Sequence, residues 1–219
     1  VSVDVSDLTD VTGVHVHDGG IGMNGPVAFP LTDAGNGTYV LAETNISPSN
    51  LDALTSGEWY LNVHTTANPN GEVRGQIVPD TTAVVTFSLS GSQEVPAVDT
   101  MAMGSGYALF DTTNNNVSLV AVTTIENATM AHIHTGFAGE NGDVLVGLVE
   151  SESTAGVWMT DGSIALDEAT ATQLLAGGHY VNVHTAANTG GEIRGQITPD
   201  NIEVYGIIAN GLQEVPAVT

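Results

Sequence analysis

The chain has 219 residues with 25 acidic side chains, two arginines, no lysine and no cysteine, so its formal net charge is −23. This charge repels phosphate backbones and excludes nucleic-acid binding, and the missing cysteines exclude disulfides and thiolate metal sites. An apolar fraction of 42% indicates a folded chain, and no apolar run approaches the ~18 residues of a membrane span.

Short segments in which apolar and polar residues alternate recur along the chain, separated by clusters of Gly, Asn, Asp and Pro. Such alternation predicts strands with one buried face. The predicted strands are 1–5, 14–17, 60–64, 73–78, 83–89, 117–122, 181–184 and 193–198. Two stretches, 47–55 and 167–176, begin with an N-cap residue and predict short helices. The expected fold is all-β, with tandem antiparallel Greek-key sandwich or barrel domains and short helical turns.

The chain repeats itself. The segment GEWYLNVHTTANPNGEVRGQIV at 57–78 matches GGHYVNVHTAANTGGEIRGQIT at 177–198, at an offset of 120. In addition, VHVHDGGIGMNGP at 14–26 matches AHIHTGFAGENGD at 131–143. A unit of this size suits one small domain, so we expect two domains.

A third match involves the C-terminal segment. GSQEVPAV at 91–98 matches GLQEVPAV at 211–218, again at an offset of 120. The first copy lacks such a leading segment, and the tail begins a third copy. The predicted domains are a first repeat at 1–88, a second repeat at 89–200 and a tail at 201–219.

Histidine is the strongest candidate for chemistry, because three histidines recur at matching positions in the two copies. They are His15, His17 and His64, and then His132, His134 and His184. Residues i and i+2 of a strand share a face, so two imidazoles can bind one ion at about 2.0–2.1 Å. A third imidazole from another strand would leave an open position on an ion such as copper or zinc. The alternative is a polar pair on a solvated strand face.

Both arginines lie in a Gly-Glu-x-Arg-Gly-Gln-Ile motif. Glu72 and Arg74 are two residues apart, as are Glu192 and Arg194, which predicts a structural ion pair in each copy. Two alternatives stay open: an arginine bonded to loop carbonyls, and an arginine that attracts an anion beside the metal.

The Gly-rich loops after the histidine pairs carry scattered acids. Glu140 and Asp143 offer a weaker alternative, an irregular calcium site, although the EF-hand pattern is absent. No Ser–His–Asp order and no carboxylate pair repeats between the copies, so we do not expect an enzyme of the hydrolase type.

The chain resembles the CHRD (chordin-type) domain family at three motifs and their second copies: HVHDGGIGMNGPV, NVHTTANPNGEVRGQI and QEVPAV. These motifs span most of each repeat. The resemblance implies an extracellular β-domain, since bacterial and archaeal members are largely secreted or surface proteins that often carry the domain in tandem. The His-Val-His at 15–17 also resembles, more weakly, the copper-ligand strand of Cu/Zn superoxide dismutases, whose copper uses four histidines.

These features predict an extracellular or cell-surface structural subunit that self-associates head to tail into a filament or matrix. A tail strand would complete the first repeat of the next copy. The tail residues expected to join copies are Gln213, Glu214, Val215 and Pro216. The alternatives are a window of a longer tandem array, a copper enzyme of the superoxide dismutase type, and a metal-scavenging surface protein.

Overall fold

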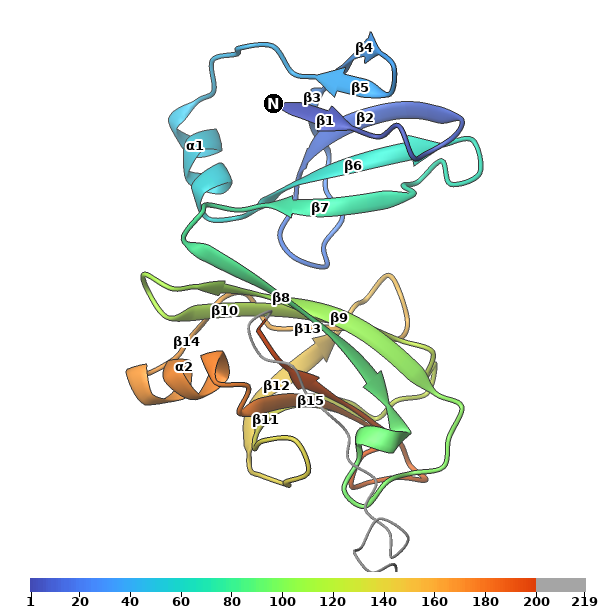
Figure 1. Ribbon diagram of the computed structural model, residues 1–219, viewed down its shortest axis with the longest axis vertical. Coiled ribbons are helices and arrows are strands. Elements are labelled where there is room, and N and C mark those ends of the chain that lie inside the picture. The colour runs from blue at the N-terminus through green and yellow to red at the C-terminus, as the bar shows by residue number, and fades with distance from the viewer. Residues whose placement is uncertain (200–219) are drawn as a thin grey trace, which may run out of the picture.

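The structure, a computed structural model, describes residues 1–199, which form two lobes stacked along the long axis (Figure 1). The first lobe contains β1 (Ser2–Asp4), β2 (Val11–Asp18), β3 (Val27–Pro30), β4 (Thr32–Gly35), β5 (Thr38–Val40), α1 (Pro48–Thr55), β6 (Trp59–Thr65) and β7 (Val73–Ile77). The second contains β8 (Thr82–Ser90), the 3₁₀ turn η1 (Gly91–Gln93), β9 (Met103–Asp111), β10 (Asn116–Thr123), β11 (Met130–Thr135), β12 (Val144–Glu150), β13 (Val157–Met159), β14 (Ile164–Ala165), α2 (Glu168–Leu175), β15 (His179–His184) and β16 (Ile193–Ile197).

The second lobe is a closed antiparallel barrel. Its strands follow the order β13-β12-β11-β15-β16-β8-β9-β10, and β13 also pairs with β10, which closes the ring. The connections from β10 to β11 and from β13 to β15 join strands that are not neighbours, as in Greek-key folds. The all-β prediction is therefore confirmed.

The first lobe has the same plan without two of the strands. The sheet β3-β2-β6-β7 corresponds to β12-β11-β15-β16, and the pairing of β1 with β5 corresponds to that of β10 with β13. Equivalents of β8 and β9 are missing from the described part of this lobe. The second edge of β7 therefore has no strand partner within residues 1–199.

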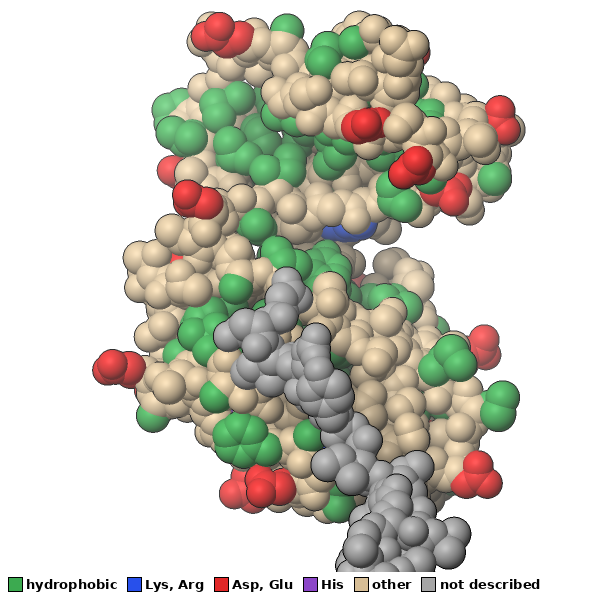
Figure 2. All heavy atoms as spheres, viewed as in Figure 1, with side chains coloured by type: hydrophobic (Ala, Val, Ile, Leu, Met, Phe, Trp, Pro, Cys, Tyr) green, Lys and Arg blue, Asp and Glu red, His purple; other side chains and the backbone are tan. Residues whose placement is uncertain are grey.

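Closure of the barrel determines how much apolar surface each lobe buries. In the second lobe, Val85, Phe87 and Leu89 alternate along β8 and point into the core. Each strand of the barrel ring contributes buried residues to this core. The first lobe buries a smaller cluster around Val14, Val16 and Trp59, and most of its other apolar residues are only partly buried. Figure 2 accordingly shows hydrophobic side chains gathered on one face of the upper lobe, with acidic side chains scattered over both lobes.

The predicted strands and helices are all present. The N-cap side chains of Ser47 and Asp167 accept hydrogen bonds from the backbone amides of Asn50 and Thr170 at the starts of α1 and α2. The predicted domain boundary is wrong by several residues, because Thr82–Ser90 pairs with β9 and β16 inside the second barrel. None of the described helices has the length and apolarity needed to span a membrane.

Candidate metal centres

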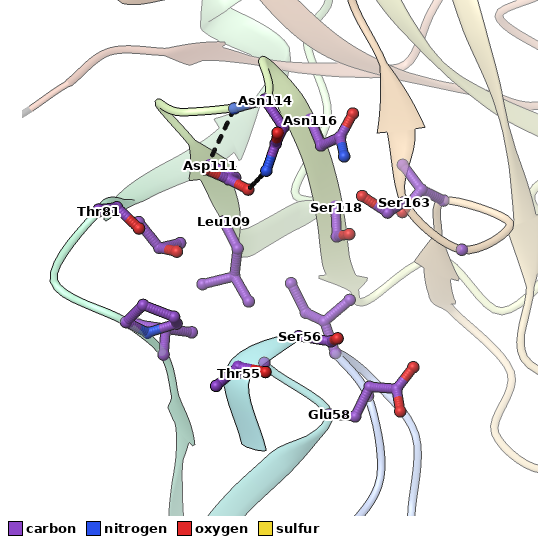
Figure 3. Close-up of a pocket in the computed structure, with 18 of the residues that line it drawn as sticks. Thr55, Ser56, Glu58, Thr81, Leu109, Asp111, Asn114, Asn116, Ser118 and Ser163 are labelled. Carbon is purple, nitrogen blue, oxygen red and sulfur yellow. Dashed lines mark hydrogen bonds between the residues drawn. The ribbon is translucent and has the colours of Figure 1, made fainter. Parts of the chain in front are cut away.

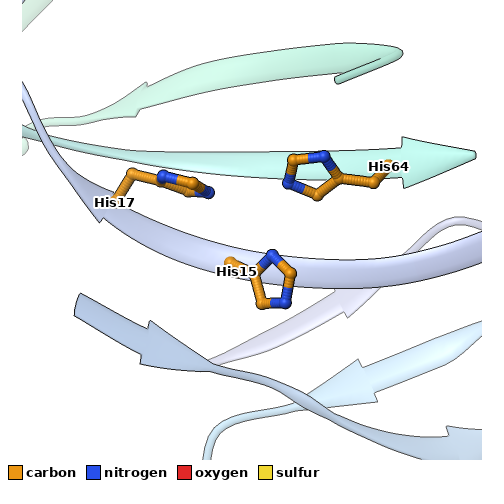
Figure 4. A group of neighbouring side chains, drawn as sticks. All are labelled: His15, His17 and His64. Atoms are coloured by element: carbon orange, nitrogen blue, oxygen red, sulfur yellow. The ribbon is translucent and has the colours of Figure 1, made fainter. Parts of the chain in front are cut away.

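The first histidine triad lies on the outer face of the sheet β3-β2-β6-β7 (Figure 4). His15 and His17 share a face of β2 because they are two residues apart, and His64 comes from the neighbouring strand β6. One ring nitrogen from each lies within 4.8 Å of the others. Two ligands of one ion bound at about 2.0–2.1 Å are at most about 4 Å apart, so a small inward movement would bring all three onto one ion.

The second triad repeats this geometry on β11 and β15. His132, His134 and His184 again bring three ring nitrogens within 4.8 Å of one another. His132 Nδ1 lies 3.1 Å from His184 Nε2, so that one proton can bridge the two nitrogens. A cation at this position would replace that proton. The structure thus brings together all six predicted ligands, as two separate sets.

Backbone carbonyls select the ring nitrogen that faces the centre of each triad. His17 Nδ1 lies 2.9 Å from the Gly25 carbonyl, and His64 Nδ1 lies 3.0 Å from the Pro69 carbonyl. A carbonyl only accepts, so Nδ1 carries the proton and Nε2 keeps its lone pair. His134 and His184 repeat the arrangement with the carbonyls of Gly142 and Thr189, both at 3.0 Å.

All three nitrogens that face the centre of the first triad, and one of those in the second, lack protein partners. In the first lobe, His15 Nδ1, His17 Nε2 and His64 Nε2 are buried and have no hydrogen-bond partner among the described residues. Buried polar atoms without partners are rare in native proteins and call for an explanation such as an ion. His134 Nε2 has the same property in the second lobe.

Burial keeps several of these imidazoles in the form that can bind a metal. Desolvation lowers the pKa of His15, and the neighbouring rings of His64 and His17 lower it further. Desolvation, followed by the ring of His134, lowers the pKa of His132. The pKa of His184 is also lowered, mainly by desolvation. These rings are therefore more readily neutral than free histidine, and a neutral ring is the form that ligates metals.

A stack of one histidine, one tyrosine and one arginine side chain supports each triad. The ring of His17 stacks on Tyr60, with centroids 5.0 Å apart, and the guanidinium carbon of Arg74 lies 3.4 Å from the centre of the same tyrosine ring. The three side chains come from the adjacent strands β2, β6 and β7, whose cross-strand partners share a face. His134, Tyr180 and Arg194 form the same layer in the second lobe.

The arginine and glutamine that recur in both repeats anchor the Gly-rich loop that bonds the second histidine. Arg74 donates to the carbonyls of Met23 (2.8 Å) and Gly20 (3.2 Å). Gln76 donates to the carbonyl of Gly19 at 2.8 Å. Tyr60 accepts a hydrogen bond from the amide of Gly25, the residue whose carbonyl bonds His17. The network therefore positions His17 through the loop.

The second loop is held in the same way and shows why glycine is required. Arg194 donates to the carbonyls of Glu140 (2.7 Å) and Phe137 (3.0 Å). A Cβ added to Gly142 would lie 1.7 Å from the Thr135 carbonyl oxygen. Only glycine can bring its carbonyl this close to the strand and to His134.

The predicted ion pairs within Gly-Glu-x-Arg-Gly-Gln are not present. Glu72 precedes β7 and turns away from Arg74, and its carboxylate instead accepts hydrogen bonds from Thr65 and Asn68, which lower its pKa. This bonding stabilises the turn whose Pro69 carbonyl holds His64. Arg74 fits the alternative of bonding to loop carbonyls.

Glu192 and Arg194 repeat this correction. Glu192 accepts from Thr185 (2.7 Å) and Asn188 (3.1 Å), and additionally from Thr100 (2.9 Å). Residues two apart share a face only within a regular strand, and β16 begins at Ile193. The glutamate therefore supports the turn after His184, while the arginine supports the loop after His134.

A segment of the second repeat, Gly91–Thr100, covers part of the outer face, and we call it the strap. Gln93 Oε1 accepts from the amide of Gln196 (3.2 Å), and the carboxylate of Glu94 is buried beside Asn182. Burial raises the pKa of Glu94 to about 7, against the opposing effect of Arg194. Every residue of β16, which the strap contacts through Gln93, is buried, whereas β7 is partly exposed.

Other predicted residues join neither triad. Glu140 and Asp143 are exposed and belong to no group of three ligands in the described chain, and the weak calcium prediction gains no geometric support there. The tail residues Gln213, Glu214, Val215 and Pro216 lie outside the described residues.

A cleft of about 770 Å³ lies between the lobes, and no histidine of either triad lines it (Figure 3). Hydroxyl and amide side chains dominate its lining, with Thr55 and Ser56 on one side and Asn114 and Asn116 on the other. The carboxylate of Asp111 is already occupied, because it accepts hydrogen bonds from Thr113 and Asn114. We assign no chemistry to this cleft.

Sequence reasoning missed the residues that support the triads. Tyr60, Gln76 and Gly25, with their counterparts in the second repeat, all recur between the copies. The recurrence of Tyr and Gln was a usable signal, but their contacts with a distant loop depend on the pairing of β2, β6 and β7.

Comparison with known proteins gives one match. The family model of the CHRD domain matches residues 1–77 and 85–197, which correspond to the two lobes. No curated protein and no solved structure matches the chain. The comparisons therefore support the first predicted resemblance and give no evidence for the weaker likeness to superoxide dismutases.

Proposed function

This chain belongs to the CHRD domain family, with two tandem domains, and we propose that it is an extracellular structural protein that binds one transition-metal ion in each repeat and associates with further copies of itself. The family is of the extracellular type. The charge of −23 is compatible with this environment, since it would concentrate cations around the chain.

The observation that carries the metal proposal is the convergence of three imidazoles twice in one chain. Each set combines a His-x-His pair with one histidine of the next strand. The carbonyl partners of His17, His64, His134 and His184 supply the outer support that metal-ligating histidines usually have. A solvated polar pair would need neither the buried nitrogens nor this support.

The donor set favours copper or zinc. Imidazole nitrogens suit these ions, whereas calcium and magnesium prefer oxygen ligands. Three protein ligands leave a position for water or a small molecule. Since His15 and His132 are only partly buried, each ion would remain accessible from the outer face.

Metal counting tests this proposal. Purified full-length protein, stripped with a chelator and dialysed against copper or zinc, should bind two ions per chain by elemental analysis. His15→Ala and His132→Ala should each lose one ion, and the double variant should lose both. His179→Phe is the matched control, because His179 lies in a strand of the second lobe but outside the triad. Unchanged stoichiometry in His15→Ala and His132→Ala would remove the sites.

A redox enzyme is the alternative use of the same sites. The open position of a three-histidine copper site could bind superoxide, but neither triad includes a fourth histidine or a carboxylate among residues 1–199. We therefore propose a binding role rather than catalysis. Copper-loaded protein that accelerates superoxide loss, with the rate abolished in the double His15→Ala/His132→Ala variant, would favour the enzyme instead.

The open edge of β7 supports the proposal of self-association. Exposed strand edges promote pairing with another chain, and addition of a strand in a head-to-tail manner produces a linear assembly. The occupant that we propose is the segment 201–219 of another copy, whose sequence corresponds to β8 and the strap at an offset of 120. Electron microscopy of the full chain should reveal fibres that are lost when residues 203–219 are deleted; fibres that persist would contradict strand donation.

A further inference from the structure

The strap is attached to the second lobe by the side chains of its Gln-Glu-Val sequence. Gln93 bonds the backbone of Gln196 on β16. Glu94 is 7% exposed and its carboxylate lies against the side-chain amide of Asn182, at 3.5 Å. Asn141 donates to the Val95 carbonyl at 2.7 Å. The glutamate is thus the one charged group that the strap inserts into the lobe.

The position of this glutamate depends on two residues of the sheet and one glycine of the turn before β16. Asn182 of β15 lies directly opposite Arg194 of β16, and Arg194 acts on the Glu94 carboxyl by its charge. A Cβ added to Gly191 would lie 2.6 Å from Glu94 Oε1. Asparagine, glycine and arginine therefore form a seat for a carboxyl group.

The first lobe contains the same seat. Asn62 of β6 lies directly opposite Arg74 of β7, and Gly71 has a positive φ of 129°, close to the 134° of Gly191. Arg74 Nε is buried without a hydrogen-bond partner among the residues that the structure describes. Within residues 1–199, no residue occupies the position in the first lobe that Glu94 has in the second.

A groove of about 450 Å³ runs beside this seat. Arg74 and Gln76 of β7 line one side of it, and Val84, Tyr107 and Val122 from the outer face of the second barrel line the other. Val84 and Val122 are 44% and 50% exposed. A strand placed against the open edge of β7 would therefore also cover exposed apolar side chains of the second lobe.

We propose that the first lobe carries a peptide-binding site for the Gln-Glu-Val-Pro sequence of a second copy, in which the carboxyl group of Glu214 occupies the seat formed by Asn62, Gly71 and Arg74. Glu214 corresponds to Glu94 at an offset of 120. The inference rests on the proposed self-association and names the side chain that specifies its partner.

Charge makes such a contact selective. The whole chain has only two cationic side chains, Arg74 and Arg194, and a net charge of −23, so two copies repel each other at most orientations. Arg74 is the one cationic side chain of the first lobe. Its attraction for the Glu214 carboxyl group would offset part of the desolvation cost, as Arg194 opposes the rise in the pKa of Glu94.

Sedimentation velocity of full-length variants tests the seat. Glu214→Ala should weaken association about 10-fold or more, the usual effect of losing a buried hydrogen bond to a charged group. The matched control Glu152→Ala removes an exposed acid of the second lobe, outside the proposed donor segment, and should leave association unchanged. Asn62→Asp, which places a second carboxylate in the seat, should weaken association without touching the tail.

A peptide with the sequence of residues 210–218 provides an independent readout. Added in excess to the full chain, it should inhibit association, whereas the same peptide with alanine at the Glu214 position should be about 10-fold less potent.

The outcomes separate the inference from the function on which it rests. If deletion of 203–219 abolishes association while Glu214→Ala and Asn62→Asp have no effect, strand donation stands and the seat is overturned. If the deletion itself has no effect on association, then strand donation fails, and with it the seat, while metal binding is untouched. Equal weakening by Glu152→Ala would indicate a general charge effect and would also overturn the seat.

Discussion

The two lobes carry the same histidine triad, one in a closed barrel and the other in a sheet whose second edge is unpaired within residues 1–199. Every residue of β16 is buried, in a strand that pairs with β8 and contacts the strap, whereas the equivalent β7 is partly exposed. Nevertheless, the triads, their tyrosines and their loop-anchoring arginines have nearly the same geometry, with the guanidinium 3.4 Å from the tyrosine ring centre in both. Four strands are therefore enough to build the site, and closure of the barrel mainly adds stability.

The largest expected difference between the lobes concerns a matched pair of apolar positions. Ile193 on β16 is fully buried, and its counterpart Val73 on β7 is 48% exposed. Ile193→Ala should lower the free energy of unfolding of the second lobe by about 2–5 kcal/mol, because it leaves a cavity in a closed core. Val73→Ala should change that of the first lobe by less than about 0.5 kcal/mol.

Tryptophan fluorescence can follow the lobes separately during urea unfolding. Trp59 reports on the first lobe and Trp158 on the second, and each is 5% exposed. Trp59→Phe and Trp158→Phe backgrounds isolate the two signals. Equal costs for the two alanine variants would show that β7 is as well covered in solution as β16, and would break the comparison.

The next effect concerns the arginine that anchors each loop. Arg194→Lys removes the paired bonds to Glu140 and Phe137, so the loop that orients His134 should loosen and metal affinity at the second site should fall about 10–100-fold. Arg74→Lys should do the same at the first site only. Competition with a chromophoric chelator measures both affinities in each variant.

The same affinities show whether the two sites bind metal independently. If Arg74→Lys also weakens the second site, the two lobes are coupled rather than independent. Each glutamine donates a hydrogen bond to the first carbonyl of its loop. Gln76→Glu and Gln196→Glu therefore perturb the same loops through a second side chain and repeat the test independently.

The smallest effect concerns a position at which the repeats differ. His179 is fully buried, and neither ring nitrogen has a partner among the described residues, whereas the first repeat has Trp59 there. His179→Phe should stabilise the second lobe by about 1–2 kcal/mol, because an unsatisfied buried polar group is removed.

The pH dependence of this gain follows from the lowered pKa of His179, which burial causes. Below the ordinary histidine pKa the unfolded chain binds a proton that the folded chain refuses, so the wild-type second lobe loses stability as the pH falls below about 6.5. The advantage of His179→Phe should therefore grow between pH 7 and pH 5. An advantage that stays constant over this range would contradict the assignment.

Much of the fold could be predicted because strand alternation and helix N-caps in the sequence match the elements that form. Alternation in Thr82–Ser90 and the N-caps at Ser47 and Asp167 predict elements that the structure contains. Other strands were missed for physical reasons: Met103–Asp111 contains two glycines that weaken its strand signal, and Val144–Glu150 is too uniformly apolar to show alternation.

The repeat and the six triad histidines can be read from the residue order, because the two copies match each other. The all-β class follows from the period of two in the strands. Only the tertiary structure decided what Glu72 and Arg74 bond, since their partners lie on turns and loops that strand pairing brings near. It also decided that, among residues 1–199, one lobe closes into a barrel and the other does not. Closure depends on which strands meet across the chain, and no local pattern encodes that pairing.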